Sequence, residues 1–175
     1  AADKLVEVGI PLRAEFCVTK QPHNLKRPMV LVTGGSGGAA PIGQAILAIL
    51  PQLLHSADVM HICGDSMVKL CESAKASLDP DLKDHYAYLE YTDEMADYMR
   101  EATVVVTRGS SQIFEIASLG RAMICIPLPS AAQNHQVKNV EYFVSRSAAV
   151  MILQSRLTPD TLYESMRADI PKDSI

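Results

Sequence analysis

The stretch VLVTGGSGGAAPIGQ, residues 30–44, constrains the fold more than any other part of the chain. A short apolar run ends in a cluster of glycines, and a helical pattern follows directly. Apolar residues in the segment 42–54 recur at the spacing i, i+3, i+4 and i+7, and Pro41 suits the first turn of a helix. A buried strand that turns through glycines into a helix is typical of a parallel α/β sheet.

The same alternation of apolar run and helical pattern repeats along the whole chain. The expected strands are residues 5–8, 29–33, 58–63, 86–90, 103–107, 123–126 and 149–153. The expected helices are residues 42–54, 66–76, 93–101, 111–119, 133–144 and 159–167. Thr92 is expected to cap the helix at residue 93, and Gly120 to stop the helix that begins at residue 111. Several strands are apolar without interruption, which indicates burial on both faces. We therefore predict a single α/β domain over residues 1–175, a Rossmann-like parallel sheet with helices on both faces.

Composition excludes several classes of partner and site. The formal charge is −4 and no Lys/Arg cluster is present, which argues against nucleic acid as a partner. No apolar run approaches the roughly 18 to 20 residues of a membrane span, and no signal peptide is recognisable. The cysteines form no C-x-x-C pair, so they are expected to be reduced thiols rather than disulfides or zinc ligands. They are Cys17, Cys63, Cys71 and Cys125.

The glycine cluster, residues 34–38, predicts a phosphate site. Its backbone N–H groups would lie beside a helix N-terminus, which attracts anions, and Ser36 adds a hydroxyl. A P-loop is excluded because no Lys follows the glycines. Residues 35–40 match the dinucleotide fingerprint in relaxed form, with Asp65 as the candidate acidic partner. A tight turn without any ligand is the remaining alternative.

A second cluster surrounds residues 107–129. A strand is expected to end at Thr107, and Gly109, Ser110 and Ser111 then open a helix. Glu115 lies one turn inside that helix. A carboxylate at this place either satisfies the helix N-terminus or accepts hydrogen bonds from ligand hydroxyls, such as the adjacent pair of a ribose. The residues themselves leave both roles open.

Uncharged polar side chains gather after the next strand. Asn134, His135, Gln136 and Asn139 share a loop and the first turn of a helix, and their donor and acceptor groups suit sugar hydroxyls. No second His, Cys or carboxylate stands at ligand spacing from His135, so no metal site is expected.

Taken in order, these segments resemble the C-terminal, donor-binding domain of the MurG-like family 28 glycosyltransferases of the GT-B fold. The resemblance rests on VGIPLRAEF, VTGGSGGAAPIGQ, EYTDEMADYM, SSQIFEIASLGRAMICIPLP and QNHQVKNVEYF, which occur in the family's order between about Gly9 and Ile152. It implies roles for single residues. Arg13 and the backbone near Thr92 would face uracil, and Met95 would pack near the nucleotide. Ser36 and the glycines would face the diphosphate, Glu115 the ribose, and Gln136 with His135 the sugar.

The complete set of expected UDP-sugar-binding residues is Arg13, Gly35, Ser36, Gly37, Gly38, Thr92, Met95, Ser110, Glu115, His135 and Gln136. No cofactor and no metal are expected. The resemblance implies an inverting, metal-independent transfer of GlcNAc from UDP-GlcNAc to lipid-linked muramyl-pentapeptide, which converts lipid I to lipid II in peptidoglycan synthesis. The acceptor would bind a missing N-terminal domain that also supplies the base. We therefore expect a fragment or subunit that is inactive alone. The intact enzyme would be cytoplasmic and peripheral at the inner face of the plasma membrane.

Some positions depart from the family's pattern. Arg108 is displaced by one residue from the family's arginine at a strand end, and the other departures are Ile10, Leu12, Gly37, Ala122 and Asn134. The alternatives within transferases are the donor-binding domain of a related UDP-sugar glycolipid synthase and a standalone donor-binding subunit. A nucleotide-sugar epimerase and a dinucleotide-binding domain are the alternatives outside that class.

Overall fold

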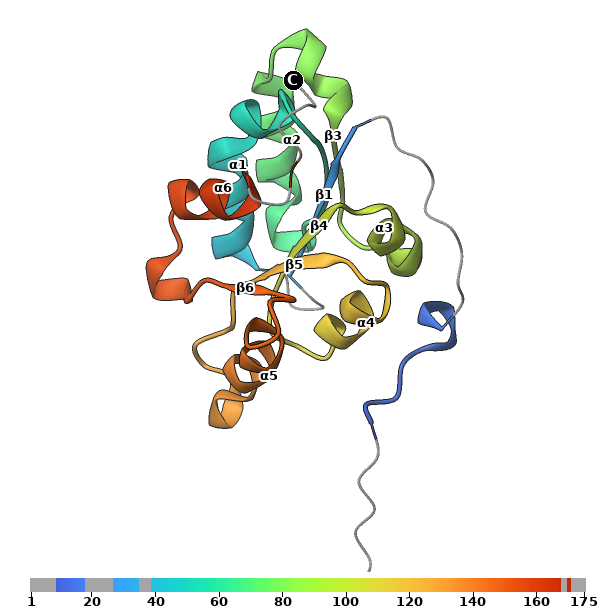
Figure 1. The fold of residues 1–175 in the computed structure, drawn as a ribbon. Helices are drawn as coiled ribbons and strands as arrows, with labels where there is room; N and C mark the ends of the chain where they lie inside the picture. The colour runs from blue at the N-terminus through green and yellow to red at the C-terminus, as the bar shows by residue number, and fades with distance from the viewer. Residues whose placement is uncertain (1–8, 18–26, 35–38, 168–169, 171–175) are drawn as a thin grey trace, which may run out of the picture.

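The computed structural model describes residues 9–17, 27–34, 39–167 and 170. At its centre lies a parallel sheet of six strands in the order β3-β2-β1-β4-β5-β6 (Figure 1). The strands are β1 (Met29–Thr33), β2 (Asp58–Ile62), β3 (Tyr86–Leu89), β4 (Val104–Thr107), β5 (Ala122–Cys125) and β6 (Val150–Met151). The predicted Rossmann-like sheet is confirmed, whereas the expected strand at residues 5–8 lies outside the described residues.

Every expected helix is present. They are α1 (Ala40–Leu54), α2 (Val68–Ser77), α3 (Met95–Glu101), α4 (Gln112–Ser118), α5 (His135–Val144) and α6 (Pro159–Arg167). Pro41 lies in the first turn of α1, as predicted. Gly120 follows the end of α4 with a φ of 65°, a left-handed conformation that glycine adopts readily and that suits its predicted role as a helix stop.

Alternating residues of each central strand face opposite sides of the sheet. Val30, Val32 and Val104 join the first core, which the apolar faces of α1, α2 and α6 complete. Leu31 and Val105 join the second core, under α3, α4 and α5. Figure 1 shows α1, α2 and α6 together on one side and α3 and α4 on the other. Cover on both faces explains why the strands are apolar without interruption.

A small polar cluster lies inside the first core. The Nδ1 atom of His61 lies 3.2 Å from the Tyr86 hydroxyl and 3.5 Å from the Cys71 sulfur. All three side chains are buried. Burial lowers the pKa of His61 to about 4, so the imidazole is neutral at pH 7.

Among the described residues, no helix combines the length and the apolar character that crossing a membrane requires. The sheet order reverses at β1 and β4, whose neighbouring strands lead away to opposite edges. In open α/β sheets, ligands bind outside the carboxyl ends of the strands at such a reversal. The loops after β1 and β4 are therefore the place to look for a site.

Candidate functional site

The carboxyl ends of β1 and β4 lie side by side, because Val32 and Val106 are partners in the parallel register. The expected diphosphate-binding residues Gly35, Ser36, Gly37 and Gly38 fall in the loop after β1, outside the described residues. The structure describes what flanks that loop. Gly34 follows β1, and α1 begins at Ala40, so the N-terminus of a helix of 15 residues comes directly after it.

Glu115 lies in the first turn of α4, and its carboxylate is paired with Arg13. The Arg13 Nε atom lies 2.8 Å from Oε1, and Nη2 lies 3.2 Å from Oε2, so each carboxylate oxygen accepts one N–H. The hydrogen-bonded carboxylate raises the pKa of Arg13. Two predicted site residues that lie 102 positions apart in the sequence thus meet directly.

The segment that carries Arg13 rests on the second core. Arg13 precedes a 3-10 turn, Ala14–Phe16, whose Phe16 is 3% exposed. The Arg13 guanidinium carbon lies 4.7 Å from the centre of the Phe16 ring, and Nη1 lies 3.0 Å from Glu15 Oε1. A cation over an aromatic face is attracted to it, so the ring and the two carboxylates together orient this guanidinium.

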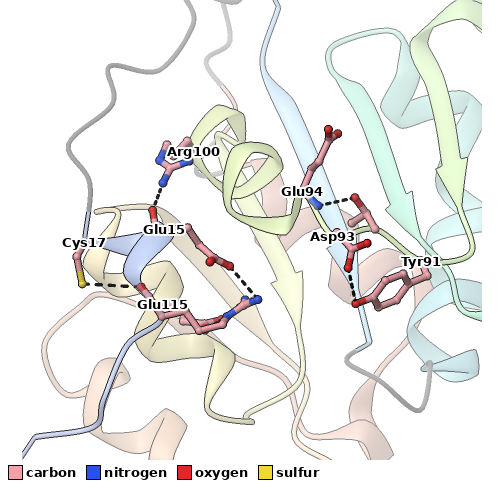
Figure 2. A network of polar contacts seen from close by, with 9 residues as sticks. Glu15, Cys17, Tyr91, Asp93, Glu94, Arg100 and Glu115 are labelled. Atoms are coloured by element: carbon pink, nitrogen blue, oxygen red, sulfur yellow. Dashed lines mark hydrogen bonds and ion pairs between the residues drawn. The ribbon is translucent and has the colours of Figure 1, made fainter.

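Arg100 of α3 holds the same turn and was not predicted. Its Nη2 atom donates to the carbonyl oxygen of Glu15 (Figure 2). Its Nη1 atom lies 2.5 Å from Asp97 Oδ1. The side chain is 5% exposed. A signal for this burial exists in the sequence, because Ala96, Met99 and Arg100 stand at i, i+3 and i+4 on the buried face of α3.

Thr92 and Met95 lie between β3 and the start of α3. The Thr92 hydroxyl accepts a hydrogen bond from the Glu94 N–H at 3.0 Å (Figure 2). We expected Thr92 to cap a helix beginning at residue 93. That is wrong, because α3 begins at Met95 and the hydroxyl instead closes a turn ahead of it. Met95 is half-buried against the second core.

The amide cluster lies after β5 and at the start of α5. The Oε1 atom of Gln136 accepts a hydrogen bond from the Leu128 N–H at 2.8 Å, so this side chain holds the loop that follows β5. His135 is exposed as the first residue of α5. Asn139 donates from Nδ2 to the carbonyl oxygen of Gly109 at 3.3 Å, which links α5 to the β4–α4 turn.

Gly109 is required by the close approach of α5. A Cβ atom at this position would lie 2.5 Å from the Gln136 carbonyl oxygen and 2.8 Å from Val140 Cγ2. Ser110, the next residue, is half-buried, and its carbonyl accepts from Ile113 at 3.2 Å. The β4–α4 turn thereby brings Ser110, Glu115 and the first turn of α5 to the same edge of the sheet.

Arg108 is buried at the end of β4 and ties three elements together. Its Nη1 atom donates to the Ile126 carbonyl at 3.0 Å and to Gln154 Oε1 at 2.7 Å. Burial lowers the pKa of its guanidinium. The strand itself ends at Thr107, whose hydroxyl donates to Gln112 at 3.0 Å. Sequence reasoning noted the displaced arginine but gave it no role.

The acidic residues that could bind a metal ion or a dinucleotide do not form such a site in the described part of the chain. Within residues 9–17, 27–34, 39–167 and 170, no three His, Cys, Asp or Glu side chains gather closely enough to hold a metal ion. The string Asp79-Pro80-Asp81 has the D-x-D form, but it opens a 3-10 helix ahead of β3, at the amino-terminal edge of the sheet. Asp65, the acidic candidate of the dinucleotide alternative, is exposed in a turn after β2.

Two hollows lie beside α4 and α5, away from Glu115 and Gln136. One of about 730 Å³ is lined by α5, β5 and the segment leading to β6, including Arg121, Tyr142 and Arg146. The other, of about 670 Å³, is apolar and lies between Ile10, Phe114 and Tyr142. Neither is lined by Glu115 or Gln136, so the hollows do not mark the predicted donor residues.

The fold is that of an α/β domain of the Rossmann type, and the loops after β1 and β4 lie at the edge where such sheets bind ligands. The sequence profile of the glycosyltransferase family 28 C-terminal domain matches residues 29–174, and the chain belongs to this family. The expected resemblance is thereby confirmed.

Known relatives agree with this assignment. A UDP-N-acetylglucosamine–N-acetylmuramyl-(pentapeptide) pyrophosphoryl-undecaprenol N-acetylglucosamine transferase of Shouchella clausii (strain KSM-K16) is 34% identical, over 91% of this chain and 46% of the relative. The transferase of the same name from Synechocystis sp. (strain ATCC 27184 / PCC 6803 / Kazusa) is 32% identical, over 91% of this chain and 44% of its own length. The crystal structure of Acinetobacter baumannii MurG superposes with a TM-score of 0.72 at 26% identity, covering 92% of this chain and 45% of that one. The chain spans about half the length of these relatives.

Proposed function

We propose that this chain is the donor-binding domain of a hexosyltransferase and binds UDP-GlcNAc. The intact enzyme transfers GlcNAc to a lipid-linked muramyl-pentapeptide, the reaction named for the relatives that align with 91% of the chain. The observation that carries the proposal is the placement of Glu115. Glu115 lies in the first turn of the helix that follows the central strand β4, on the side where parallel sheets bind nucleotides, and its carboxylate is paired with a second predicted site residue, Arg13.

The nucleotide is bound in parts that match the chemistry of each residue. Glu115 accepts hydrogen bonds from the ribose hydroxyls, with Ser110 beside it. Arg13, Met95 and the backbone near Thr92 contact the uracil end. Gln136, whose Oε1 is engaged by Leu128, retains its amide N–H groups for the sugar hydroxyls, and His135 lies next to it.

The diphosphate lies on the glycine loop, with Ser36 as a side-chain donor, ahead of the N-terminus of α1. A helix N-terminus presents backbone N–H groups and the positive end of the helix dipole, so the start of α1 stabilises negative charge. The same field favours departure of UDP when an acceptor hydroxyl attacks the anomeric carbon and inverts it, in a transfer that needs no metal.

The remaining parts of the reaction lie beyond this chain. The lipid-linked acceptor and the base that deprotonates it belong to an N-terminal domain. This chain binds the donor but does not transfer sugar alone. The intact enzyme works at the cytoplasmic face of the plasma membrane as a peripheral protein.

Calorimetric titration with UDP, UDP-GlcNAc, UDP-glucose and NAD tests the proposal. The chain is expected to bind UDP and to bind UDP-GlcNAc more tightly than UDP-glucose. Glu115→Gln keeps the shape of the side chain but removes its charge, and should weaken UDP binding by about tenfold or more, since a hydrogen bond to a charged group is lost. Glu164→Gln is the matched control, because Glu164 pairs with Arg167 on the exposed side of α6.

Binding of NAD without binding of UDP would contradict the proposal and favour the dinucleotide alternative. Unchanged UDP affinity in Glu115→Gln would remove the ribose role from this residue.

A further inference from the structure

We infer that Arg100 is a positioning residue for the donor site, which it orients through Arg13. By holding the Ala14–Phe16 turn, it fixes the guanidinium that orients Glu115, and it thereby controls how strongly the site distinguishes ribose from 2′-deoxyribose. The inference rests on the proposed role of Glu115 in binding ribose.

The burial of Arg100 indicates that its charge serves a purpose outside the core. The residue stands in the apolar stripe of α3 with Ala96 and Met99, where a methionine or leucine would fill the space. Burying a guanidinium is costly unless its donors are used. Here Nη1 pairs with Asp97, Nη2 donates to the Glu15 carbonyl, and Nε has no partner among the described residues.

That single carbonyl couples Arg100 to Arg13. The 3-10 turn is closed by the Phe16 N–H, which donates to the Arg13 carbonyl at 3.0 Å. Because Glu15 lies inside this turn, a contact that fixes its carbonyl also fixes the backbone of Arg13. Phe16 also anchors the turn, because its ring is part of the second core. Figure 2 shows Arg100 above the turn and Glu115 below it.

The pairing of Arg13 with Glu115 leaves the carboxylate able to bind a ligand. A carboxylate has about four acceptor positions, two on each oxygen. The arginine occupies one on Oε1 and one on Oε2, in the parallel geometry that a guanidinium favours. One acceptor position on each oxygen remains, and two neighbouring acceptors fit the adjacent 2′ and 3′ hydroxyls of a ribose.

The terminal torsion of a glutamate is soft, so the carboxylate rotates easily when nothing holds it. Loss of the Arg100 contact lets the turn shift and Arg13 lose its paired geometry. Glu115 then accepts from one hydroxyl at a time, and the site loses selectivity for the 2′ hydroxyl before it loses nucleotide binding.

The test measures dissociation constants of UDP and 2′-deoxy-UDP for the chain and for Arg100→Met, which suits the apolar stripe. The unaltered chain should prefer UDP by about tenfold or more, because the deoxy ligand leaves an acceptor of Glu115 unpaired. In Arg100→Met the preference should fall below about threefold. Arg100→Lys keeps the charge but cannot contact both Asp97 Oδ1 and the Glu15 carbonyl oxygen. Its preference for UDP should lie between those of the unaltered chain and Arg100→Met.

Arg27→Met is the matched control. Arg27 makes the same kind of contacts at the amino-terminal end of the sheet, with Nε 3.0 Å from Asp58 Oδ1 and Nη2 2.7 Å from the Leu54 carbonyl. Its loss should lower stability and leave the preference for UDP unchanged.

A double-mutant cycle identifies the route. If Arg100 acts through Arg13, Arg100→Met should not change the preference further once Arg13→Lys has removed the paired geometry. A folded Arg100→Met, or Arg100→Lys if the first does not fold, that keeps the full preference for UDP overturns the inference. So does an additive effect in the cycle. Failure of the unaltered chain to bind UDP contradicts the proposed function instead, and the two results are therefore distinguishable.

Discussion

The buried polar groups on the two faces of the sheet have different partners. In the first core, His61, Tyr86 and Cys71 lie close together and meet one another. In the second core, Arg100 reaches out of the buried layer to a backbone carbonyl that lies next to Arg13 and thus to the site.

The charge states differ in the same way. Burial lowers the pKa of His61 and raises the pKa of Tyr86, so both of these side chains are neutral at pH 7. The hydrogen bond to Glu115 raises the pKa of Arg13, so this guanidinium near the site stays charged. The His61 cluster, whose members contact one another, contributes to packing. The chain of contacts from Arg100 through Arg13 to Glu115 joins separate segments and can position a ligand.

The largest expected effect concerns His61 and stability. The unfolded chain takes up a proton near the ordinary histidine pKa of 6.5, while the folded chain does so only near 4. The contribution of the buried neutral imidazole is therefore complete above about pH 6.5 and is lost as the pH falls towards 4. The difference corresponds to roughly 3 kcal/mol in the free energy of unfolding. Urea unfolding at several pH values measures it, and UDP affinity at pH 7 serves as the second measurement.

His61→Gln should remove this part of the pH dependence without changing UDP affinity at pH 7. His55→Gln is the control, because His55 is exposed at the end of α1 and its removal should leave the pH dependence intact. Weaker UDP binding by His61→Gln at pH 7 would show that the His61 cluster also serves the site, contrary to this comparison.

Gly109→Ala should have the next largest effect and should act on the site. The added methyl would lie 2.5 Å from the backbone oxygen of Gln136, so the first turn of α5 must move. Overpacking of this kind costs about 1 to 3 kcal/mol of stability. The variant should also lose part of the affinity that UDP-GlcNAc has over UDP, since Gln136 and His135 are proposed to hold the sugar. Thermal unfolding and calorimetry measure the two effects.

Gly9→Ala is the control, because a Cβ at Gly9 would meet no atom of the described residues within 4 Å, its two chain neighbours aside. If Gly109→Ala loses stability but keeps the full difference between the two ligands, α5 does not position the sugar.

The sequence predicted the sheet and its helices because periodicity is a local property. The continuous apolar runs at β1 and β4 and the stripe of α1 depend only on neighbouring residues and on burial. Arg13 and Glu115 were both predicted as site residues, for uracil and for ribose. Their direct contact was not predicted, because it joins residues 102 positions apart through the packing of a turn on the second core.

Other parts of the site depended on detail that the sequence leaves open. The hydroxyl of Thr92 was expected to cap a helix beginning at residue 93, yet it closes a turn ahead of α3, which begins at Met95. Threonine is a common residue type in both places, so the sequence does not distinguish them. Arg100 carried a signal in its spacing, but a charged residue in an apolar stripe does not show which carbonyl it will reach. The roles of Ser36 and the glycines of the loop stay predictions.

The smallest expected effect concerns Thr92. Its hydroxyl is compared with that of Thr158, which makes the same kind of hydrogen bond on the other face of the sheet. Thr92 accepts from the Glu94 N–H at 3.0 Å beside the site, and Thr158 accepts from the Thr161 N–H at 3.1 Å at the start of α6. Replacing either by valine keeps the shape and removes the acceptor, at a cost of about 0.5 to 1 kcal/mol in the free energy of unfolding. Only Thr92→Val should also weaken UDP binding, by about twofold to threefold, because the turn is proposed to present its backbone to uracil. Thr92→Ser restores the acceptor and should restore affinity. Equal UDP affinity in the two valine variants, measured by calorimetry beside their unfolding curves, would show that the turn ahead of α3 contributes to the fold and not to the nucleotide.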